Sequence, residues 1–351
     1  MSLSRFINKY NPKKKIEPII IAEAGVNHEG SMEIAKRLID EAKQGGADAI
    51  KFQSYKANKI AVKTSPAYWD LAQEPTKSQY KLFKKYDKFW KKEFIKLKEY
   101  CDKVNIEFLS TPFDVESASF LNDLMEVFKI SSSDLNNKPF IDKICQYNKA
   151  IILSTGASYF WEIEQVVDFI KSKGNNLALL HCVLNYPTLD NNANLSKITR
   201  LNSQFPSIPI GYSDHTLPKD MKILEIAAIS GACIIEKHFT HDKNLKGNDH
   251  YHSMDYNDLK KFKKRMKRIK EIMGDSDNEV LETEKISRTN ARRSLVSAKF
   301  IPAGKIIQEK DITWKRPGTG LEPDKIGQII GNKAKIDIQE DTILLWEQFS
   351  N

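Results

Sequence analysis

Short apolar runs recur along the chain, and each is followed by a stretch in which apolar side chains return every three or four positions. Eight such runs occur, at residues 18–24, 47–53, 106–113, 127–132, 150–155, 177–183, 208–213 and 233–239. They are apolar almost throughout rather than alternating, as parallel strands covered by helices require. Eight strand–helix units predict an α/β fold, a (β/α)8 (TIM) barrel, with an open doubly wound sheet as the alternative.

The pattern changes near Gly274, so the barrel is predicted over residues 1–273. Residues 274–292 are polar and charged, which suits a linker. Residues 293–351 contain strand-like pieces at 294–298, 335–338 and 343–346, separated by turns rich in proline and glycine. A small β-rich second domain is predicted there. The length of 351 residues agrees, because it exceeds what one ordinary core supports.

The chain has a net positive charge, but its basic residues are not clustered in the sequence. Lys and Arg number 55 against 46 Asp and Glu, a formal net charge of +9 that attracts anions in general. The basic residues are spread along the chain, and the densest run, 260–265, lies within helical spacing of apolar positions. We therefore expect a solvated surface and anionic small molecules as partners, with no nucleic acid.

The spacing of the cysteines and the hydropathy of the chain indicate the cellular compartment of the protein. Cys101, Cys145, Cys182 and Cys233 lie far apart and form no CxxC pair, so neither a zinc thiolate site nor a disulfide framework is expected. No apolar run reaches 18 residues, and no apolar segment typical of a signal peptide follows the N-terminus. We expect a cytoplasmic protein without a membrane span.

Polar side chains appear where the predicted strands end. In chain order they are Glu23; Lys51 and Gln53; Ser110 and Thr111; Lys129, Ser132 and Asp134; Ser154 and Thr155; His181 and Tyr186; Asp214 and His215; and Glu236, Lys237 and His238. A single polar residue at a strand end is ordinarily a core residue whose side chain is hydrogen-bonded within the protein. Eight sets of them would need many hydrogen-bond partners, and each buried polar group left without one costs about 1–3 kcal/mol of stability. Because barrel enzymes carry their sites at the C-terminal strand ends, an enzyme site is predicted there.

The histidines and lysines among these residues indicate which ligands the predicted site binds. His215 and His238 end consecutive predicted strands, so they can share a divalent metal, with Glu23 as a nearby acidic group. Lys51 and Lys129, with the neighbouring hydroxyls, favour a clamp for phosphate or carboxylate over a single Schiff-base nucleophile. The chain contains no GxxxxGK[ST] or GxGxxG motif, so no nucleotide site is expected.

Nine short motifs follow one another in the same regions. They are Ile-Ala-Glu-Ala-Gly-Val-Asn-His-Glu-Gly (21–30), Lys-Phe-Gln (51–53), Ser-Thr-Pro-Phe (110–113), Leu-Ser-Thr-Gly (153–156), Leu-His-Cys (180–182), Tyr-Pro-Thr (186–188), Ser-Asp-His-Thr (213–216), Glu-Lys-His-Phe-Thr (236–240) and Arg-Pro-Gly (316–318). This ordered set resembles the N-acetylneuraminate (sialic acid) synthase family over residues 20–349. The C-terminal module resembles that family's antifreeze-like (SAF) domain.

The resemblance implies a transferase that condenses phosphoenolpyruvate with open-chain N-acetylmannosamine to a nine-carbon sialic acid and releases phosphate. It implies that phosphoenolpyruvate is held by Lys51, Thr111, Lys129, Ser132 and Ser154. It implies sugar contacts from Gln53, Tyr186, Asp249 and Arg316, the arginine coming from the other subunit of a domain-swapped homodimer. The implied catalytic residues are Glu23, Glu236, His215 and His238. Mn2+, or another divalent ion such as Mg2+ or Co2+, is implied as the cofactor, on His215 and His238.

Some positions depart from the family pattern, so the identity of the sugar substrate stays open. Leu184 stands two residues before Tyr186, where a polar residue is common, and Asp134 stands where glutamate is familiar. The alternatives are a legionaminate or pseudaminate synthase acting on a diacetamido-trideoxyhexose, or a synthase of a 6-phosphorylated sugar. Other classes are a nucleic-acid-binding protein, which needs clustered basic and aromatic residues, and an ice- or ligand-binding C-terminal module, which needs a flat apolar face.

Overall fold

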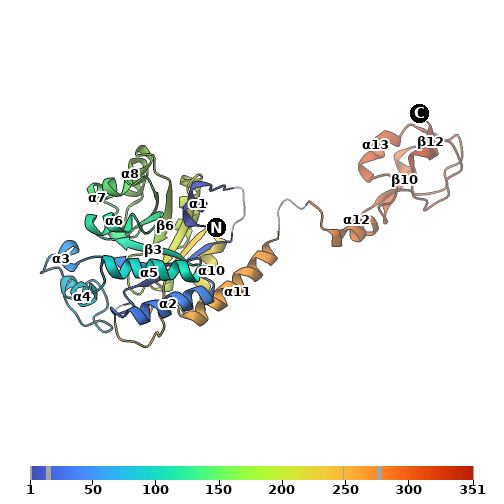
Figure 1. The fold of residues 1–351 in the computed structure, drawn as a ribbon. Coiled ribbons are helices and arrows are strands. Elements are labelled where there is room, and N and C mark those ends of the chain that lie inside the picture. Colours follow the sequence, from blue (N-terminus) through green and yellow to red (C-terminus); the bar gives the residue numbers. More distant parts are fainter. Residues whose placement is uncertain (1, 13–16, 248, 275–278, 351) are drawn as a thin grey trace. The chain divides into compact units, whose positions relative to one another are not determined.

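The computed structural model describes residues 2–12, 17–247, 249–274 and 279–350 (Figure 1). The chain divides into two compact units, Met1–Ile272 and Met273–Asn351. The linker predicted over 274–292 includes residues 275–278, which lie outside the described residues. Its remainder contains a 3-10 turn at Glu282–Glu284 and the helix α12 (Lys285–Ala291).

Eight parallel strands form the centre of the first unit and confirm the predicted (β/α)8 barrel. Their hydrogen-bonded order is β3-β2-β1-β8-β7-β6-β5-β4, and the barrel is nearly closed because β3 and β4 also lie against each other. The strands are β1 (Ile19–Gly25), β2 (Ala49–Ser54), β3 (Glu107–Pro112), β4 (Val127–Ile130), β5 (Ala150–Ser154), β6 (Leu177–Cys182), β7 (Ile210–Asp214) and β8 (Ile234–His238).

Helices alternate with these strands and cover the outside of the barrel (Figure 1). They are α2 (Met32–Gly45), α5 (Lys91–Val104), α6 (Val115–Leu121), α7 (Lys138–Cys145), α8 (Phe160–Ser172), α9 (Ser196–Gln204), α10 (Lys222–Ile229) and α11 (Tyr256–Met273). Two further helices, α3 (Ala57–Ile60) and α4 (Gln79–Tyr86), lie in the connection between β2 and α5. Ser31 caps α2 by accepting a hydrogen bond from the Ile34 N–H. Asp255 and Asp258 exchange backbone and carboxylate hydrogen bonds, which fixes the start of α11.

The N-terminal end of the barrel is closed by a helix that the apolar pattern did not predict. This helix, α1 (Leu3–Asn8), buries Leu3, Phe6 and Ile7 among apolar residues at the first positions of several strands. The Leu3 N–H donates to Glu107 Oε2 at 2.8 Å. The opposite end of the barrel, where the strands finish, is therefore the end available for a site.

The second unit has its own small core, built around Leu295, Ile307 and Leu344. The predicted strand at 294–298 is confirmed as β9 (Ser294–Ser297). The predicted strands at 335–338 and 343–346 are wrong, because each makes only an isolated bridge in an irregular segment. The other elements are β10 (Ile312–Lys315), α13 (Ile326–Ile329), β11 (Lys333–Ala334) and β12 (Phe349–Ser350).

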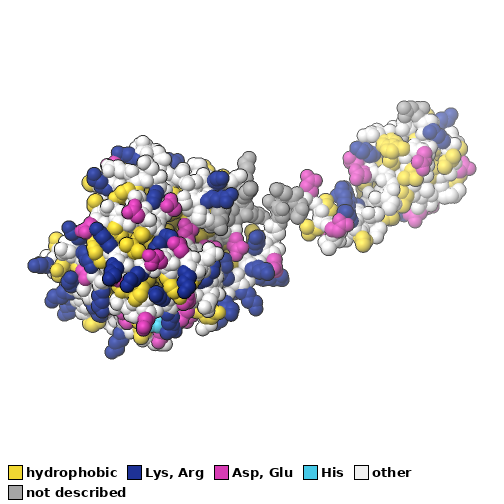
Figure 2. Space-filling view, viewed as in Figure 1, with side chains coloured by type: hydrophobic (Ala, Val, Ile, Leu, Met, Phe, Trp, Pro, Cys, Tyr) yellow, Lys and Arg dark blue, Asp and Glu magenta, His cyan; other side chains and the backbone are white. Residues whose placement is uncertain are grey.

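Charged side chains are mixed on the surface. On the face of the first unit seen in Figure 2, Lys and Arg are scattered and interrupted by Asp and Glu. Among the described residues, no helix combines the length and the apolar character needed to cross a membrane.

Candidate active site at the C-terminal ends of the barrel strands

A cavity of about 420 Å³ lies where the barrel strands end. It is lined by all twelve barrel residues to which the family resemblance assigns a role: Glu23, Lys51, Gln53, Thr111, Lys129, Ser132, Ser154, Tyr186, His215, Glu236, His238 and Asp249. Of the other polar residues at the predicted strand ends, Asp134 also lines the cavity, whereas Ser110, Thr155, His181, Asp214 and Lys237 do not. Arg316 directly follows β10 in the second unit, so its contact with the sugar stays a prediction. The barrel alone thus gathers twelve of the thirteen residues.

Strand register explains why these side chains meet. Glu23 on β1 is paired with Lys51 on β2 and with His238 on β8. Ser213 on β7 is paired with Glu236 on β8. Because paired residues of neighbouring strands face the same side of a sheet, their side chains converge inside the barrel.

Two lysines and two glutamates form a buried charge cluster at the base of the cavity. The Lys51 ammonium contacts the Glu23 carboxylate directly and lies 3.7 Å from Glu236 Oε1. The Lys129 ammonium lies 3.5 Å from the same Glu236 oxygen. All four side chains are at least nine-tenths buried, so each charge depends on the others for stabilisation.

The pKa values of the two carboxyl groups shift in opposite directions. Burial raises the pKa of Glu23, and the attraction of Lys51 only partly offsets it. Burial also acts to raise the pKa of Glu236, but attraction to Lys129 and Lys51 outweighs it, so this pKa lies below its usual value. When Glu23 holds its proton, two ammonium groups face one carboxylate, and a positive charge remains for an anionic ligand.

Hydroxyl groups surround this positive charge. Lys51 donates to Thr111 Oγ1 at 2.9 Å, and Ser132 Oγ accepts from the Gly156 N–H at 2.8 Å. Ser154 Oγ is buried and makes no hydrogen bond within the described residues. Since a buried hydroxyl without a partner costs free energy, Ser154 is available for a ligand oxygen.

Histidines form the opposite part of the cavity. The His215 and His238 ring centroids are 5.3 Å apart, and a third ring, His252, lies 4.8 Å from His238. Burial lowers the pKa of His215 to about 4 and that of His238 well below its usual value. Neutral imidazoles keep one nitrogen lone pair free, which is the form that binds a metal ion.

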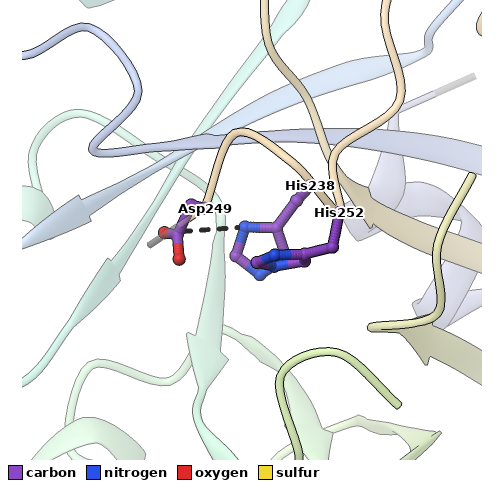
Figure 3. A group of neighbouring side chains, drawn as sticks. All are labelled: His238, Asp249 and His252. Atoms are coloured by element: carbon purple, nitrogen blue, oxygen red, sulfur yellow. Dashed lines mark ion pairs between the residues drawn. The ribbon is translucent and has the colours of Figure 1, made fainter. Parts of the chain in front are cut away.

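One group of side chains at the edge of this cavity has the composition of a metal site; His238 and Asp249 line the cavity, and His252 lies against His238. His238, Asp249 and His252 place their ligand atoms within 4.8 Å of one another, and all three side chains are buried (Figure 3). Two nitrogens and one oxygen suit a divalent ion such as Mn2+, Co2+ or Zn2+. Sequence reasoning missed His252, because only its position after the eighth strand hinted at the site. His215 is not a member of this group.

Two residues that the resemblance assigns to the sugar, Gln53 and Tyr186, lie beside the charge cluster and the histidines, and Tyr186 begins an aromatic wall. Gln53 Nε2 donates to Glu23 Oε1 at 3.0 Å, and the Tyr186 ring packs 4.1 Å from the His215 ring. Tyr68 lies 6.2 Å from Tyr186 and carries the wall into the segment between β2 and α5. That segment also lines the cavity with Tyr55, Ile60, Leu82 and Phe83.

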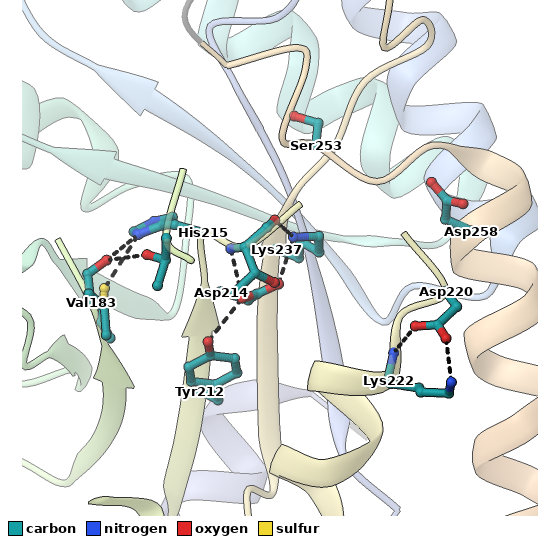
Figure 4. A network of polar contacts seen from close by, with 12 residues as sticks. Val183, Tyr212, Asp214, His215, Asp220, Lys222, Lys237, Ser253 and Asp258 are labelled. Carbon is teal, nitrogen blue, oxygen red and sulfur yellow. Dashed lines mark hydrogen bonds and ion pairs between the residues drawn. The ribbon is translucent and has the colours of Figure 1, made fainter. Parts of the chain in front are cut away.

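A buried ion pair lies behind the histidines, on the helix-facing side of the strands (Figure 4). Lys237 donates to Asp214 Oδ2 at 2.6 Å and to the Thr216 carbonyl at 2.7 Å. Tyr212 donates to Asp214 Oδ1 at 2.9 Å. Asp214 directly precedes His215, and Lys237 directly precedes His238, so the pair ties the two histidine-bearing strand ends together.

Changing Lys237 to methionine is expected to lower the free energy of unfolding by about 3–5 kcal/mol, because Asp214 would be left as a buried, unpaired charge. Urea unfolding followed by circular dichroism measures this. Lys219→Met is the matched control, since Lys219 pairs with Asp190 at the surface at 2.6 Å, and exposed pairs contribute at most about 1 kcal/mol. Equal, small effects of the two changes would contradict a structural role for the buried pair.

The fold and cavity define a class of protein, a (β/α)8 barrel with a buried lysine–glutamate cluster beside histidines at the C-terminal strand ends. The NeuB family model matches residues 38–278, and the SAF domain model matches residues 292–350. The chain is 40% identical over 334 residues to N,N'-diacetyllegionaminic acid synthase of Campylobacter jejuni, covering 93% of this chain and 98% of that protein. It is 30% identical over 341 residues to N-acetylneuraminate-9-phosphate synthase of Homo sapiens, covering 95% and 92%.

A solved structure agrees with these matches. N-acetylneuraminic acid (sialic acid) synthetase from Leptospira borgpetersenii has 38% sequence identity and a TM-score of 0.68, covering 78% of this chain and 90% of that chain. The chain belongs to the NeuB family, the phosphoenolpyruvate-dependent nonulosonic acid synthases. It is therefore an enzyme that forms a carbon–carbon bond, and the predicted family and its SAF domain are confirmed.

Proposed function

We propose that this enzyme condenses phosphoenolpyruvate with an open-chain diacetamido-trideoxyhexose, as in legionaminate synthesis. The observation that supports this sugar is the aromatic and aliphatic wall of the cavity, which extends from Tyr186 through Tyr68 to Leu82. A trideoxy sugar presents a methyl group and a second acetamido group where N-acetylmannosamine presents hydroxyls, and apolar groups bury favourably against such a wall. The 40% identity to a diacetyllegionaminic acid synthase supports the same sugar class.

The charge cluster supports a specific place for phosphoenolpyruvate. Lys51 and Lys129 would hold its anionic groups as charges, with Thr111, Ser132 and Ser154 donating to its oxygens. The methylene carbon would bond to the aldehyde carbon of the sugar. Water would add to the adjacent carbon of the three-carbon unit, and phosphate would leave by cleavage of its C–O bond.

The two carboxyl groups suit opposite proton transfers in this reaction. Glu23, whose pKa is raised by burial, can donate a proton to the aldehyde oxygen as the new bond forms. Glu236, whose carboxylate is kept ionised by Lys129 and Lys51, can accept the proton that the attacking water loses. A divalent ion such as Mn2+, or Mg2+ or Co2+, would polarise the aldehyde when bound among the cavity histidines and Asp249.

N-acetylmannosamine is the second candidate, supported by the 38% identity to a solved sialic acid synthetase. A 6-phosphorylated sugar is less well supported by the cavity. Apart from Lys51 and Lys129, the described lining residues include one further lysine or arginine, Lys59, and its side chain is exposed. A second phosphate would need a stronger concentration of charge than one solvated ammonium provides.

A panel of sugars tests this choice. We expect kcat/KM to be about 10- to 100-fold higher for the diacetamido-trideoxyhexose than for N-acetylmannosamine, the range that apolar pockets achieve against an added hydroxyl. Phosphate release is measured with phosphoenolpyruvate, Mn2+ and each sugar, including the 6-phosphate and the pseudaminate-type isomer. A preference for N-acetylmannosamine would make the second candidate correct, and release without any sugar would show simple hydrolysis.

A further inference from the structure

Basic residues occur along the whole chain, but their balance with acidic residues is uneven. Residues 56–92, which connect β2 to the start of α5, contain ten lysines, no arginine and three acidic residues. Their net charge is +7, against +9 for the whole chain. We propose that this segment, the basic connection, is a positively charged entrance that draws phosphoenolpyruvate from solution into the cavity.

The basic connection forms one wall of the cavity. Helix α4 turns one face toward the cavity, with residues at helical spacing: Gln79, Leu82, Phe83 and Tyr86. Lys81, Lys84 and Lys85 occupy the positions between them and are exposed. Figure 2 shows several Lys and Arg side chains over the part of the first unit where Figure 1 places α3 and α4. Because a helix with its side chains is about 10–12 Å across, these ammonium groups lie at the edge of the cavity rather than inside it.

Three lysines with uncompensated charges gather around Ser78, the N-cap of α4. Ser78 Oγ donates to the Lys63 carbonyl at 3.3 Å and accepts from the Lys81 N–H at 3.4 Å, and Lys77 directly precedes Ser78. The side chains of Lys63, Lys77 and Lys81 are exposed and make no ion pair with the described residues. Their charges therefore act on solutes outside the protein.

Two of the three acidic residues in the segment are used for internal contacts. The buried Glu74 carboxylate accepts from the Thr76 N–H at 3.0 Å and from Thr76 Oγ1 at 2.6 Å. The Asp87 carboxylate accepts from a backbone N–H at 3.1 Å. Each carboxylate also lies 3.5 Å from one ammonium group, that of Lys85 or Lys84. The remaining lysines leave the solvent side of the connection positive.

The two substrates of this reaction class differ in charge. Phosphoenolpyruvate carries a phosphate and a carboxylate, about three negative charges at pH 7, whereas an acetamido sugar is neutral. A cleft surrounded by one sign of charge raises the association rate of an oppositely charged ligand by about 10- to 1,000-fold at low ionic strength. The basic connection should therefore act on phosphoenolpyruvate alone, and Lys51 and Lys129 would receive it inside. The inference rests on the proposed function only in placing phosphoenolpyruvate in this cavity.

Removing three of these charges tests the proposal. We expect the triple variant Lys63→Gln, Lys77→Gln and Lys81→Gln to lower kcat/KM for phosphoenolpyruvate by about 3- to 10-fold at an ionic strength of about 0.01 M. The difference from the wild type should vanish near 1 M, where the screening length is about 3 Å. Neither kcat nor kcat/KM for the neutral sugar should change. Steady-state phosphate release measures all three quantities.

Helix α11 supplies a control with the same loss of charge. Lys261, Lys264 and Lys267 are exposed and make no ion pair with the described residues, and no residue of α11 lines the cavity. Changing these three lysines to glutamine should leave the kinetics for phosphoenolpyruvate nearly unchanged. Arginine at positions 63, 77 and 81 keeps the charge and should retain the wild-type kinetics. Thermal melting checks that each variant is folded.

Calorimetric titration of phosphoenolpyruvate without any sugar repeats the comparison. It does not need the condensation reaction, so an error in the proposed sugar leaves this test intact. The Kd of the connection variant should rise by the same factor as kcat/KM falls. Equal losses in the two glutamine variants would assign the effect to overall net charge. An unchanged connection variant would leave its lysines as solvated surface or as a contact for an acidic macromolecule, and a loss that persists near 1 M salt would indicate a direct contact; each result would overturn the proposal.

Discussion

Replacing Lys129 with methionine is expected to lower kcat/KM for phosphoenolpyruvate by about a thousandfold. The Lys129 ammonium is buried and lies 3.5 Å from Glu236, longer than a short charge-assisted hydrogen bond, so it can turn toward an anionic ligand. Burial, with repulsion from Lys51, lowers its pKa, and a bound anion would relieve both effects. Truncating one partner of a buried, hydrogen-bonded charge pair between protein and ligand costs about 2–5 kcal/mol of binding free energy, and about 4 kcal/mol corresponds to a thousandfold lower kcat/KM.

Lys59→Met is the matched control for this change. Lys59 lines the same cavity, but its side chain is exposed, so solvent screens its charge and the substitution should change kcat/KM little. Steady-state phosphate release at saturating sugar measures both variants. A loss in Lys59→Met equal to that in Lys129→Met would show that general electrostatic attraction, rather than a specific contact, binds the substrate. A large loss confined to a phosphorylated sugar would show that Lys59 binds the sugar phosphate.

Changing Glu23 to glutamine is expected to reduce kcat by about 100- to 10,000-fold, the range that general acid–base catalysis contributes. Glutamine keeps the shape of the side chain but cannot donate a proton to the aldehyde oxygen. The pH dependence follows from the raised pKa of Glu23. The group acts while protonated, so wild-type activity should fall as pH rises through that raised value, and this fall should be absent from the residual activity of Glu23→Gln.

Glu236→Gln provides the comparison for this prediction. Glu236 is kept ionised by Lys129 and Lys51, so its loss should lower the rate but leave the alkaline fall in place. Measurements of kcat/KM from pH 5 to 9, with thermal melting as a check on folding, separate the two variants. Retention of the alkaline fall in Glu23→Gln would assign it to another group and remove Glu23 as the proton donor.

The sequence, with the family resemblance it carries, determined the barrel and twelve of the residues that line its cavity, but not the wall between β2 and α5. Apolar runs without alternation indicated covered parallel strands, and polar residues at the ends of those runs identified the site, because strand ends in a barrel meet at one rim. The pairing of Glu23 with Lys51 and His238 follows from this order once the register is known. The small second domain was less predictable, since its segments at 335–338 and 343–346 make single bridges whose partners lie far along the chain.

Tertiary structure decided the features that depend on loops and on burial. The helix α1 has too few residues for periodicity to reveal it, yet it closes the barrel because its apolar face fits the interior. His252 comes after the last strand, and backbone hydrogen bonds of Met254 bring its loop back beside His238. Glu23 and Glu236 are the same residue type at neighbouring positions of the barrel. Burial raises the pKa of Glu23 despite its contact with Lys51, whereas attraction to both Lys129 and Lys51 outweighs burial and lowers the pKa of Glu236. Chain order determines which strands are neighbours, but the protonation of a carboxyl group depends on how closely charges approach it in a medium of low dielectric constant.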